Sequence, residues 1–463
     1  MFYRLSSYII HAPIEGTEDE MLLHGYTGAV DIINKDTISY ILNLPDNINP
    51  SNIPFSDNTL SNLINRGYLT SLTPDEEHEK LIHIANVLHA LNKRFGKNFG
   101  FIVSYDCNLR CPYCYEAGIS NFGDSWNRST LTHEQVDAIY KIIDNIEPIK
   151  QLRSNKLILY GGEPLLKENY EIVNYIVKKG ESYGFTFSAI TNGYDLSVFS
   201  DLLGPGKIEN VQITVDGPEE LHNSTRVHRD RIPTFERIIN NISLALDLNV
   251  KVKVRMNCDQ RNLGGMDILK DYFRAKGFIA HKNFSFYGAL AHDFQKDLKF
   301  KNKQAASVEY VSREGYAKQC ANCNPEKEDA SQDEGITDRL LKSFKSGRPY
   351  GLLSNYCGIF SGSYFFDPKG NIHSCWGTIG KTQHRIGTYS KDGDYLFNES
   401  LAKLHDTNVG KHPQCSKCRF ALICRGGCSV KDINMCAMMP RLFGIAANRA
   451  YKSYFRNMSD IIN

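Results

Sequence analysis

The chain has 463 residues, which is enough for two or three domains with a sizeable core. Its net charge of +2 gives no reason to expect a nucleic acid or another polyanion as a partner. We expect no membrane span, because no run of 18 apolar residues occurs, and no secretion, because the N-terminus lacks a basic region followed by a long apolar core. Thirteen cysteines in such a chain indicate metal binding in a reducing cytoplasm and not disulfides.

Residues 1–95 contain no cysteine and form the first expected domain. β-rich, alternating runs come first, and short amphipathic helical patterns follow them. The expected strands are Tyr3–Ile10 and Ala29–Ile33, and the expected helices are Ile38–Leu42, Leu60–Arg66 and Leu81–Leu91.

From Phe99 onward, short β-rich runs alternate with helical stretches such as Leu131–Ile146 and Glu168–Tyr183. Six strand–helix units in series predict a parallel sheet with right-handed crossovers, and six units instead of eight predict an open α/β fold, a partial (β/α)6 barrel. In such barrels the catalytic residues lie at the C-terminal ends of the strands. The expected strands are Gly100–Tyr105, Lys156–Tyr160, Phe185–Thr191, Val211–Val215, Val250–Met256 and Asn283–Tyr287.

Three cysteines with four- and three-residue spacing, Cys107, Cys111 and Cys114, directly follow the first expected strand. They can bind three corners of a [4Fe–4S] cube and leave the fourth iron open to a ligand that is not protein. An open iron on a low-potential cluster can coordinate S-adenosylmethionine and cleave it to a 5′-deoxyadenosyl radical. Tyr113 is placed to pack near the adenine of the bound nucleoside. The alternative, a zinc site, rarely has this spacing.

Glycines and polar residues follow the next strands at the points where these strands end. Gly161 and Gly162 let the backbone approach a ligand closely, and Glu163 adds a carboxylate that can accept hydrogen bonds from an ammonium group. By itself this segment is equally consistent with a turn that caps a strand. Because polar residues recur at successive strand ends, we expect a lined binding site there. The further residues at these ends are Thr191, Asn192, Thr214, Arg255 and Asn257.

A second group of seven cysteines lies near the C-terminus. A zinc ribbon accepts four ligands and would leave three of the seven without a role, so we interpret the group as ligands of further iron–sulfur clusters. Cys320 and Cys323, just upstream, either supply one more ligand or are loop thiols, and the lone Cys258 is expected in the core. The seven are Cys357, Cys375, Cys415, Cys418, Cys424, Cys428 and Cys436.

The segments SYDCNLRCPYC, YGGEP, TNG and VQITVDGPEELHNSTR resemble the radical S-adenosylmethionine superfamily. The resemblance implies that the three upstream cysteines hold the catalytic cluster in a partial (β/α)6 barrel. It also implies that Gly162 and Glu163 meet the methionine amine of S-adenosylmethionine, and that a basic residue such as Arg255 holds the carboxylate. The candidate ribose and methionine contacts are Thr191, Asn192, Thr214 and Asn257.

The C-terminal cysteines resemble the SPASM extension of that superfamily, with all seven of its cysteines in place. This resemblance implies two auxiliary [4Fe–4S] clusters, and so three clusters in all. In the sulfatase maturases of this group, an aspartate proposed as catalytic base follows the cysteine that matches Cys375. Here this residue is Trp376, which argues against sulfatase maturation and leaves the catalytic base unassigned. By resemblance, the outer cluster takes Cys415, Cys418, Cys424 and Cys436, and the inner one takes Cys357, Cys375 and Cys428, with its fourth position open or filled by Cys320 or Cys323.

Residues 1–95 are similar to the winged-helix peptide-recognition domain that is often fused to such maturases and adds a leader peptide to a sheet edge as a strand. The alternative is a plain extension that packs on the barrel. The resemblance as a whole implies an enzyme that abstracts hydrogen from a side chain of a ribosomally made precursor peptide and forms a thioether or carbon–carbon crosslink, with flavodoxin or ferredoxin as electron donor. Two alternatives are another oxidation of a peptide or protein side chain, and a non-catalytic iron–sulfur protein.

The expected domains are residues 1–95 for recognition, 96–310 for the barrel, 311–350 as a linker, and 351–463 for the SPASM domain with a C-terminal helix.

Overall fold

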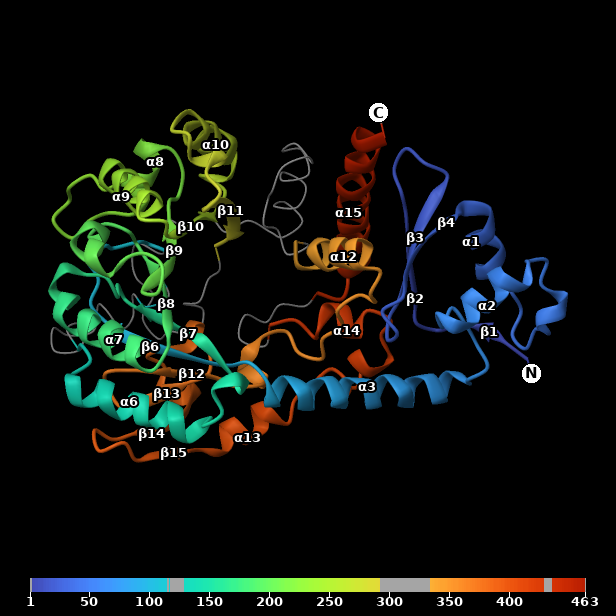
Figure 1. Ribbon diagram of the computed structural model, residues 1–463, viewed down its shortest axis with the longest axis horizontal. Coiled ribbons are helices and arrows are strands. Elements are labelled where there is room, and N and C mark those ends of the chain that lie inside the picture. The colour runs from blue at the N-terminus through green and yellow to red at the C-terminus, as the bar shows by residue number, and fades with distance from the viewer. Residues whose placement is uncertain (1, 115, 117–128, 292–333, 429–434, 463) are drawn as a thin grey trace. The chain divides into compact units, whose positions relative to one another are not determined.

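The computed structural model describes residues 2–114, 116, 129–291, 334–428 and 435–462 (Figure 1). They form two compact units, and each unit is described by itself. Unit 1 consists of residues 1–93, 332–361 and 406–463, and unit 2 consists of residues 94–331 and 362–405. Among the described helices, none combines the length and the apolar character that a membrane crossing requires.

Unit 2 is built on a ten-stranded sheet in the order β11-β10-β9-β8-β7-β6-β12-β13-β14-β15. Its strands β6 to β11 are parallel neighbours, which confirms the six strands expected from the sequence. The two ends of this order do not pair with each other in the described chain, so the sheet stays open. The parallel strands are β6 (Lys97–Ser104), β7 (Arg153–Gly161), β8 (Thr186–Thr191), β9 (Ile208–Thr214), β10 (Lys251–Cys258) and β11 (Phe284–Leu290).

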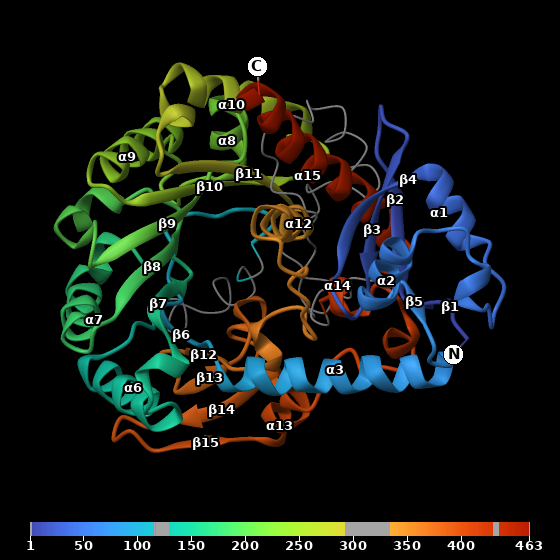
Figure 2. The same ribbon diagram turned by 45° about the vertical axis from the view of Figure 1, so that its right-hand side comes forward.

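Helices cover one face of this sheet, as Figure 2 shows for α6, α7 and α9. Alternate residues of β6, such as Phe99 and Phe101, are fully buried with Ile139 and Ile143 of α6. Ile102, between them, belongs to a second buried cluster, so β6 is a continuous buried run that is covered on both faces, as is typical of a parallel strand. The third strand is followed by the 3-10 helix η4 (Leu196–Leu202) instead of an α-helix. The helices of unit 2 are α6 (His133–Ile146), α7 (Tyr170–Ser182), α8 (Glu219–Thr225), α9 (Phe235–Asp247), α10 (Met266–Ala275) and α13 (Glu399–His405).

Residues 362–405 extend the sheet of unit 2, although the sequence placed them with the C-terminal region. Strand β12 pairs with β6 in parallel, and β13, β14 and β15 continue the sheet as antiparallel neighbours. The apolar side chains of Tyr364, Phe366 and Ile372 therefore enter the same core as Phe99. The added strands are β12 (Ser363–Phe366), β13 (Asn371–His373), β14 (Arg385–Tyr389) and β15 (Tyr395–Phe397).

Unit 1 contains a three-stranded antiparallel sheet in the order β2-β3-β4, and a two-stranded pair of β1 and β5. The expected strand Tyr3–Ile10 is divided, because a turn separates β1 from β2. Strand β3 was not expected, since Met21, Leu22 and Leu23 are all buried and give no alternating pattern. The strands are β1 (Arg4–Leu5), β2 (Ile9–Pro13), β3 (Asp19–His24), β4 (Val30–Asn34) and β5 (Leu69–Thr70).

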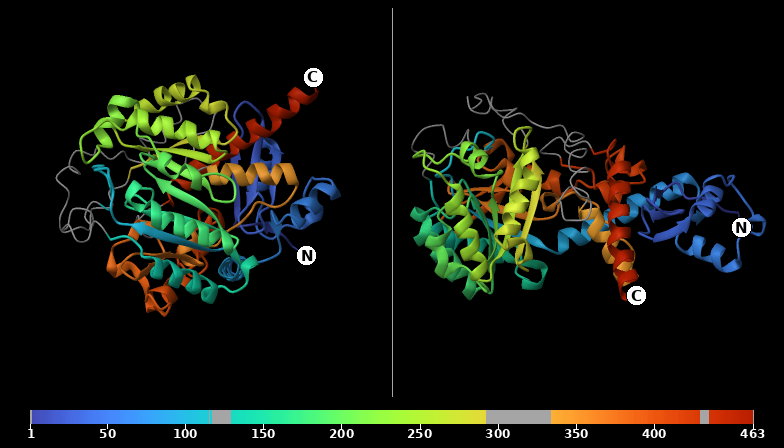
Figure 3. Two further views of the ribbon diagram at one scale, coloured as in Figure 1. Left: turned by 60° about the vertical axis from the view of Figure 1, so that its left-hand side comes forward. Right: turned by 90° about the horizontal axis from the view of Figure 1, so that it is seen from above.

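The helices of unit 1 come from both ends of the chain. The three expected N-terminal helices are confirmed as α1, α2 and α3, and helices α12 and α15 pack side by side (Figure 3). The core joins N-terminal and C-terminal segments, because Met21 and Leu23 of β3 pack with Leu442 and Phe443 of α15. Residues 1–93 are therefore not a compact unit by themselves. The helices are α1 (Lys35–Leu42), α2 (Asp57–Asn65), α3 (Pro74–Arg94), α12 (Glu334–Ser346), α14 (Ala421–Cys424) and α15 (Met439–Ile462).

Candidate functional site

The loop that carries Cys107, Cys111 and Cys114 leaves the C-terminal end of β6 in unit 2. Two main-chain hydrogen bonds of 2.8 Å hold it against the segment after α8. The N–H of Arg110 donates to the carbonyl of Val227, and the carbonyl of Asn108 accepts from the N–H of Arg229. The backbone of the cysteine loop is thus fixed by protein contacts alone.

The three thiols of this loop are surrounded by protein. Burial raises the pKa of each of them, to about 12 for Cys114, and the thiol of Cys111 adds to this effect for both Cys107 and Cys114. The guanidinium of Arg226 acts in the opposite direction on Cys111 and Cys114. Cys111 is buried, and Cys107 and Cys114 are half-buried. Three such thiols with raised pKa values need a cation to become thiolates, and this donor set therefore fits iron.

Gly161 and Gly162 bring the end of β7 against the backbone that leads into the cysteine loop. A Cβ atom on Gly161 would lie 2.2 Å from the carbonyl oxygen of Ser104, and one on Gly162 would lie 2.5 Å from that of Asp106. Gly161 also has a φ of +141°. Only glycine fits both positions, because the end of β7 contacts the backbone that follows β6.

Glu163 is the buried carboxylate of the site. Its Oε1 accepts hydrogen bonds from Thr191 Oγ1 at 2.6 Å and from the N–H of Leu165 at 2.8 Å, and its Oε2 accepts from the N–H of Asn192 at 2.6 Å. Burial raises the pKa of Glu163 to about 7, against the effect of these donors and of Arg226. The carboxylate thus ties the ends of β7 and β8 together and keeps one lone pair of Oε2 without a protein donor in the described chain.

Asn192 connects this carboxylate to the cysteine loop. Its Nδ2 donates to Asn108 Oδ1 at 2.7 Å and lies 3.9 Å from the Sγ of Cys107. Its Oδ1 accepts from the N–H of Tyr194 at 2.8 Å, which fixes the orientation of the amide. The predicted residues Glu163, Thr191 and Asn192 therefore lie in one network beside the first cysteine.

A second network joins the end of the cysteine loop to β9 and β10. The hydroxyl of Tyr113 donates to Asp216 and accepts from Arg226 Nη1 at 2.7 Å and from Asn257 Nδ2 at 3.2 Å. Arg226 and Asp216 also form an ion pair at 3.6 Å, and both are buried. Neither Asp216 nor Arg226 was predicted as a site residue, because the role of neither can be read from local spacing.

The remaining predicted strand-end residues lie near this network. Thr214 and Arg255 are direct neighbours across β9 and β10. The charge of Arg255 contributes to lowering the pKa of Asp216, although burial, the larger effect, raises it. The Nε of Arg255 is buried and has no hydrogen-bond partner within the described chain. An unpaired buried donor of this kind fits a site that receives an anionic group.

Four of the seven C-terminal cysteines lie together in unit 1. The thiol of Cys424 has its pKa raised to about 11, first by burial and then by the thiols of Cys415, Cys436 and Cys418. These are the four cysteines expected at the outer cluster. Among the described residues, no three His, Cys, Asp or Glu side chains lie close enough together to hold a single metal ion. In a [4Fe–4S] cube each thiolate binds a different iron, so the thiolates lie further apart than the ligands of a single ion.

The other predicted cysteines are divided between the two units. In unit 1, burial raises the pKa of Cys357, and the nearby thiol of Cys428 adds to this effect. Cys375 belongs to unit 2, where the next residue, Trp376, packs its ring against Tyr160 and Phe365 and stays 45% exposed. Cys258 is fully buried in the core, as expected, whereas Cys320 and Cys323 lie outside the described residues.

Comparisons with known proteins agree with this site. Residues 101–259 match the model of the Radical SAM superfamily. The chain is 25% identical over 191 residues to an S-adenosylmethionine-dependent nucleotide dehydratase of Psychrobacter lutiphocae, which covers 40% of the chain and 63% of that protein. It is 23% identical over 354 residues to a cysteine-type anaerobic sulfatase-maturating enzyme of Clostridium novyi, which covers 70% of the chain and 85% of that protein.

Solved structures share the fold. The structure of native anSMEcpe with bound AdoMet superposes with a TM-score of 0.55 at 18% identity and covers 79% of this chain and 99% of that one. The matched segment 101–259 begins in β6, contains the cysteine loop and both hydrogen-bond networks, and ends just after β10. Residues 101–259 therefore resemble the radical SAM superfamily, and the chain is similar to a sulfatase-maturating enzyme over 70% of its length.

Proposed function

We propose that this enzyme is a peptide maturase that forms a crosslink in a ribosomally made precursor peptide. The observation that carries the proposal is the cysteine loop at the end of β6, with its buried thiols and the networks of Glu163 and Arg226 beside it. The C-terminal cysteines that lie together in unit 1 add the auxiliary clusters typical of peptide-modifying enzymes. When bound, the open cluster and S-adenosylmethionine supply a 5′-deoxyadenosyl radical.

Different residues of this chain would contact different groups of S-adenosylmethionine. Glu163 Oε2 has a lone pair left for the methionine amine, and the unpaired Nε of Arg255 can receive the carboxylate. Asn192 and Asn257 orient the cysteine loop from two sides through Asn108 and Tyr113. Thr191 and Thr214 stand beside them at strand ends and complete the set of proposed contacts, together with Gly161 and Gly162.

The proposed clusters use the remaining thiols. The outer cluster takes the four cysteines that lie together, and the inner cluster takes Cys357, Cys375 and Cys428, with its fourth position open or filled by Cys320 or Cys323. An external donor, flavodoxin or ferredoxin, would supply the electrons that a radical enzyme of this class needs. Trp376 stands where a sulfatase maturase has its aspartate, which favours a crosslinking reaction over sulfatase maturation.

A peptide is the substrate class that the relatives support. The similarity to the sulfatase-maturating enzyme covers 85% of that protein, and a structure of native anSMEcpe with a TM-score of 0.53 contains AdoMet and the Cp18Cys peptide. In unit 1, β4 is an edge strand of the three-stranded sheet and is only partly buried. Such an edge can accept an extended leader peptide as a fourth strand.

The radical step is tested by replacing Cys107, Cys111 and Cys114 together with alanine. Anaerobically reconstituted enzyme with dithionite should release 5′-deoxyadenosine from S-adenosylmethionine, and the triple variant should release none. Cys258→Ala is the matched control, because this cysteine is buried in the core of the same unit. Nucleoside release by the triple variant at the rate of the control would show that another part of the chain binds S-adenosylmethionine.

The substrate is tested with a short peptide encoded beside this gene, analysed by mass spectrometry after the reaction. A crosslink removes two hydrogen atoms from the peptide, and tandem fragmentation locates the new bond. Without its leader, the same peptide should bind less tightly in fluorescence anisotropy. An unchanged peptide mass, with 5′-deoxyadenosine still formed, would contradict the crosslinking proposal and leave the radical step intact.

A further inference from the structure

The sheet of unit 1 holds the loop that carries two of the proposed outer-cluster ligands. The hydroxyl of Tyr8 donates to the carbonyl of Ser416 at 3.3 Å, and Arg419 Nη1 donates to the carbonyl of Ile9 at 3.0 Å. Gly25 completes the contact, since a Cβ atom there would lie only 2.3 Å from the carbonyl oxygen of Arg419. The backbone of residues 416–419 therefore lies directly against β2 and the turn after β3.

The cysteines of this region pack on cores that N-terminal residues build. Cys415 and Cys418 border a cluster made of Tyr8, Tyr26 and Leu81 together with Leu422. Cys424 and Cys428 border a second cluster, to which β2 and β3 contribute. Residues that lie more than 300 positions apart in the sequence thus form one support for the thiols.

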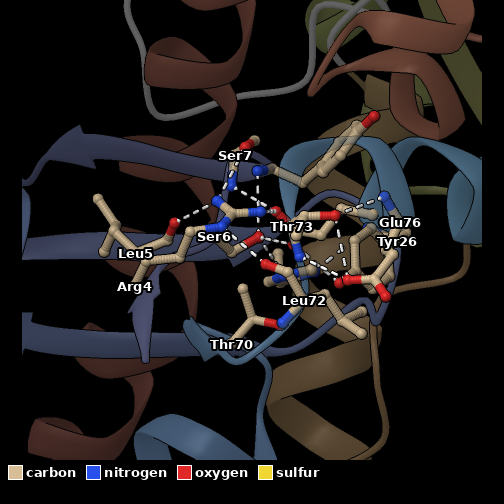
Figure 4. Close-up of polar contacts among 12 residues, drawn as sticks. Arg4, Leu5, Ser6, Ser7, Tyr26, Thr70, Leu72, Thr73 and Glu76 are labelled. Carbon is tan, nitrogen blue, oxygen red and sulfur yellow. Dashed lines mark hydrogen bonds and ion pairs between the residues drawn. The ribbon is translucent and has the colours of Figure 1, made fainter. Parts of the chain in front are cut away.

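A single buried carboxylate fixes the N-terminal side of this support. Glu77 of α3 has no exposed surface and accepts from Arg4 Nη2 at 2.7 Å, Ser6 Oγ at 2.6 Å, the N–H of Ser7 at 2.9 Å and the hydroxyl of Tyr26 at 2.9 Å. Figure 4 labels Arg4, Ser6, Ser7 and Tyr26 within a group of residues that polar contacts connect. Burial opposes the negative charge, but these donors outweigh it and hold the pKa of Glu77 below its usual value.

The residues that Glu77 fixes are direct neighbours of those that hold the cluster loop. The N–H of Tyr8 donates to Ser6 Oγ at 3.1 Å, and the rings of Tyr8 and Tyr26 lie 5.3 Å apart in an edge-to-face contact. The carbonyl of Tyr8 accepts from the N–H of Gly25 at 2.8 Å. Without the carboxylate, the buried guanidinium of Arg4 and the hydroxyl of Tyr26 would each lose a partner, which strongly destabilises a buried site.

We propose that Glu77 is a positioning residue for the outer auxiliary cluster, and that residues 1–93 form part of the scaffold of this cluster. The inference rests on the proposed function, because it needs the outer cluster to exist. It has a reciprocal consequence, since a cluster that is held by this sheet must also stabilise it. Deleting the N-terminal region would therefore remove cluster support as well as any leader site.

The test compares Glu77→Ala with Glu76→Ala in the full-length chain. Glu76 is the matched control, because it is exposed and its carboxylate bonds only to Thr73 among the described residues. After anaerobic reconstitution we expect about twelve iron atoms per chain in the control and about eight in Glu77→Ala. The electron paramagnetic resonance signal that shifts on addition of S-adenosylmethionine should stay in both variants, since the cysteine loop lies in unit 2.

A second variant keeps the test valid if Glu77→Ala does not fold. Gly25→Ala should lose iron in the same way, whereas Gly444→Ala in α15 should not, because its added Cβ meets no atom within 4 Å. In the unmutated protein, hydrogen exchange at residues 8–10 and 24–26 should be slower with iron bound than after its removal. Wild-type iron contents in both Glu77→Ala and Gly25→Ala would overturn the inference. A wild-type chain with only about four iron atoms would instead overturn the auxiliary clusters of the proposed function.

Discussion

At the scale of single residues, the site depends on buried charges whose partners come from several strands. The carboxylate of Glu163 accepts hydrogen bonds from three donors of the chain, and burial raises its pKa to about 7. Arg226 pairs with Asp216 and with the hydroxyl of Tyr113. Removing one partner from a buried charged network usually costs more than the interaction itself contributes, because the other partner is left without solvent or counter-charge.

The pKa of Glu163 predicts a pH dependence for the binding of S-adenosylmethionine. A carboxylate attracts the methionine amine and a neutral acid does not, so affinity should fall as the pH decreases through about 7. The decrease approaches about tenfold per pH unit well below the pKa. Equilibrium dialysis between about pH 6 and about pH 8 measures it.

The variant Glu163→Gln is the control for this pH dependence, since its amide does not titrate. It should bind S-adenosylmethionine more weakly and show no step near neutral pH. An equal step in Glu163→Gln and in the unmutated enzyme would assign the titration to another group.

At the scale of elements, the strands of unit 2 are joined by side chains as well as by their backbones. Asp367, at the end of β12, accepts from Tyr105 Oη at 2.6 Å and from the N–H of Asn371 at 2.8 Å, and lies 3.3 Å from His373 Nε2. Burial opposes its charge, but these partners hold the pKa of Asp367 below its usual value. Tyr105 lies just before the cysteine loop, and His373 lies two residues before Cys375. The carboxylate of Asp367 therefore positions both segments.

Replacing Asp367 with alanine should lower the thermal midpoint of unit 2 by about 5–10 °C, because a buried hydrogen-bonded charge is lost. Asp367→Asn keeps part of the bonding and should lower it less. Asp392→Ala, in an exposed turn of the same unit, serves as the control. Circular dichroism on heating measures all three, and equal midpoints for Asp367→Ala and the control would show that the contact carries no stability.

At the scale of the whole molecule, the cysteines are distributed unequally between the two units. Unit 2 holds the cysteine loop and Cys375, while unit 1 holds Cys357, Cys428 and the four cysteines that we propose for the outer cluster. The cysteine loop and the four cysteines proposed for the outer cluster therefore depend on different units. This distribution makes the clusters separable by mutation.

We expect about twelve iron atoms per reconstituted chain, in agreement with three [4Fe–4S] clusters. Replacing Cys415 and Cys418 with alanine should remove about four of them and leave S-adenosylmethionine cleavage in place, since the cysteine loop lies in the other unit. Iron analysis and Mössbauer spectroscopy measure this. Stoichiometric zinc in the unmutated chain would contradict the cluster interpretation of the C-terminal cysteines.

The sequence by itself determined the features that depend on local spacing. All six parallel strands and the helices α1, α2, α6 and α7 were predicted within a few residues, because hydrophobic periodicity reports burial over short windows. Helix α3 was predicted only over Leu81–Leu91 and begins at Pro74. The grouping of Cys415, Cys418, Cys424 and Cys436 was likewise expected from the family pattern and stays a prediction, supported by the effect of the other three thiols on the pKa of Cys424. The central strand β3 was missed because its buried run does not alternate.

Only the tertiary structure decided which distant residues meet. It joined residues 362–405 to the sheet of unit 2 through β12, and residues 1–93 to the C-terminal cysteines. It also paired Tyr113 with Arg226 and Glu77 with Arg4, across separations of 113 and 73 residues. No local pattern encodes such pairs, because a buried charge finds its partner through the packing of whole elements, and this packing is fixed only when the complete core forms.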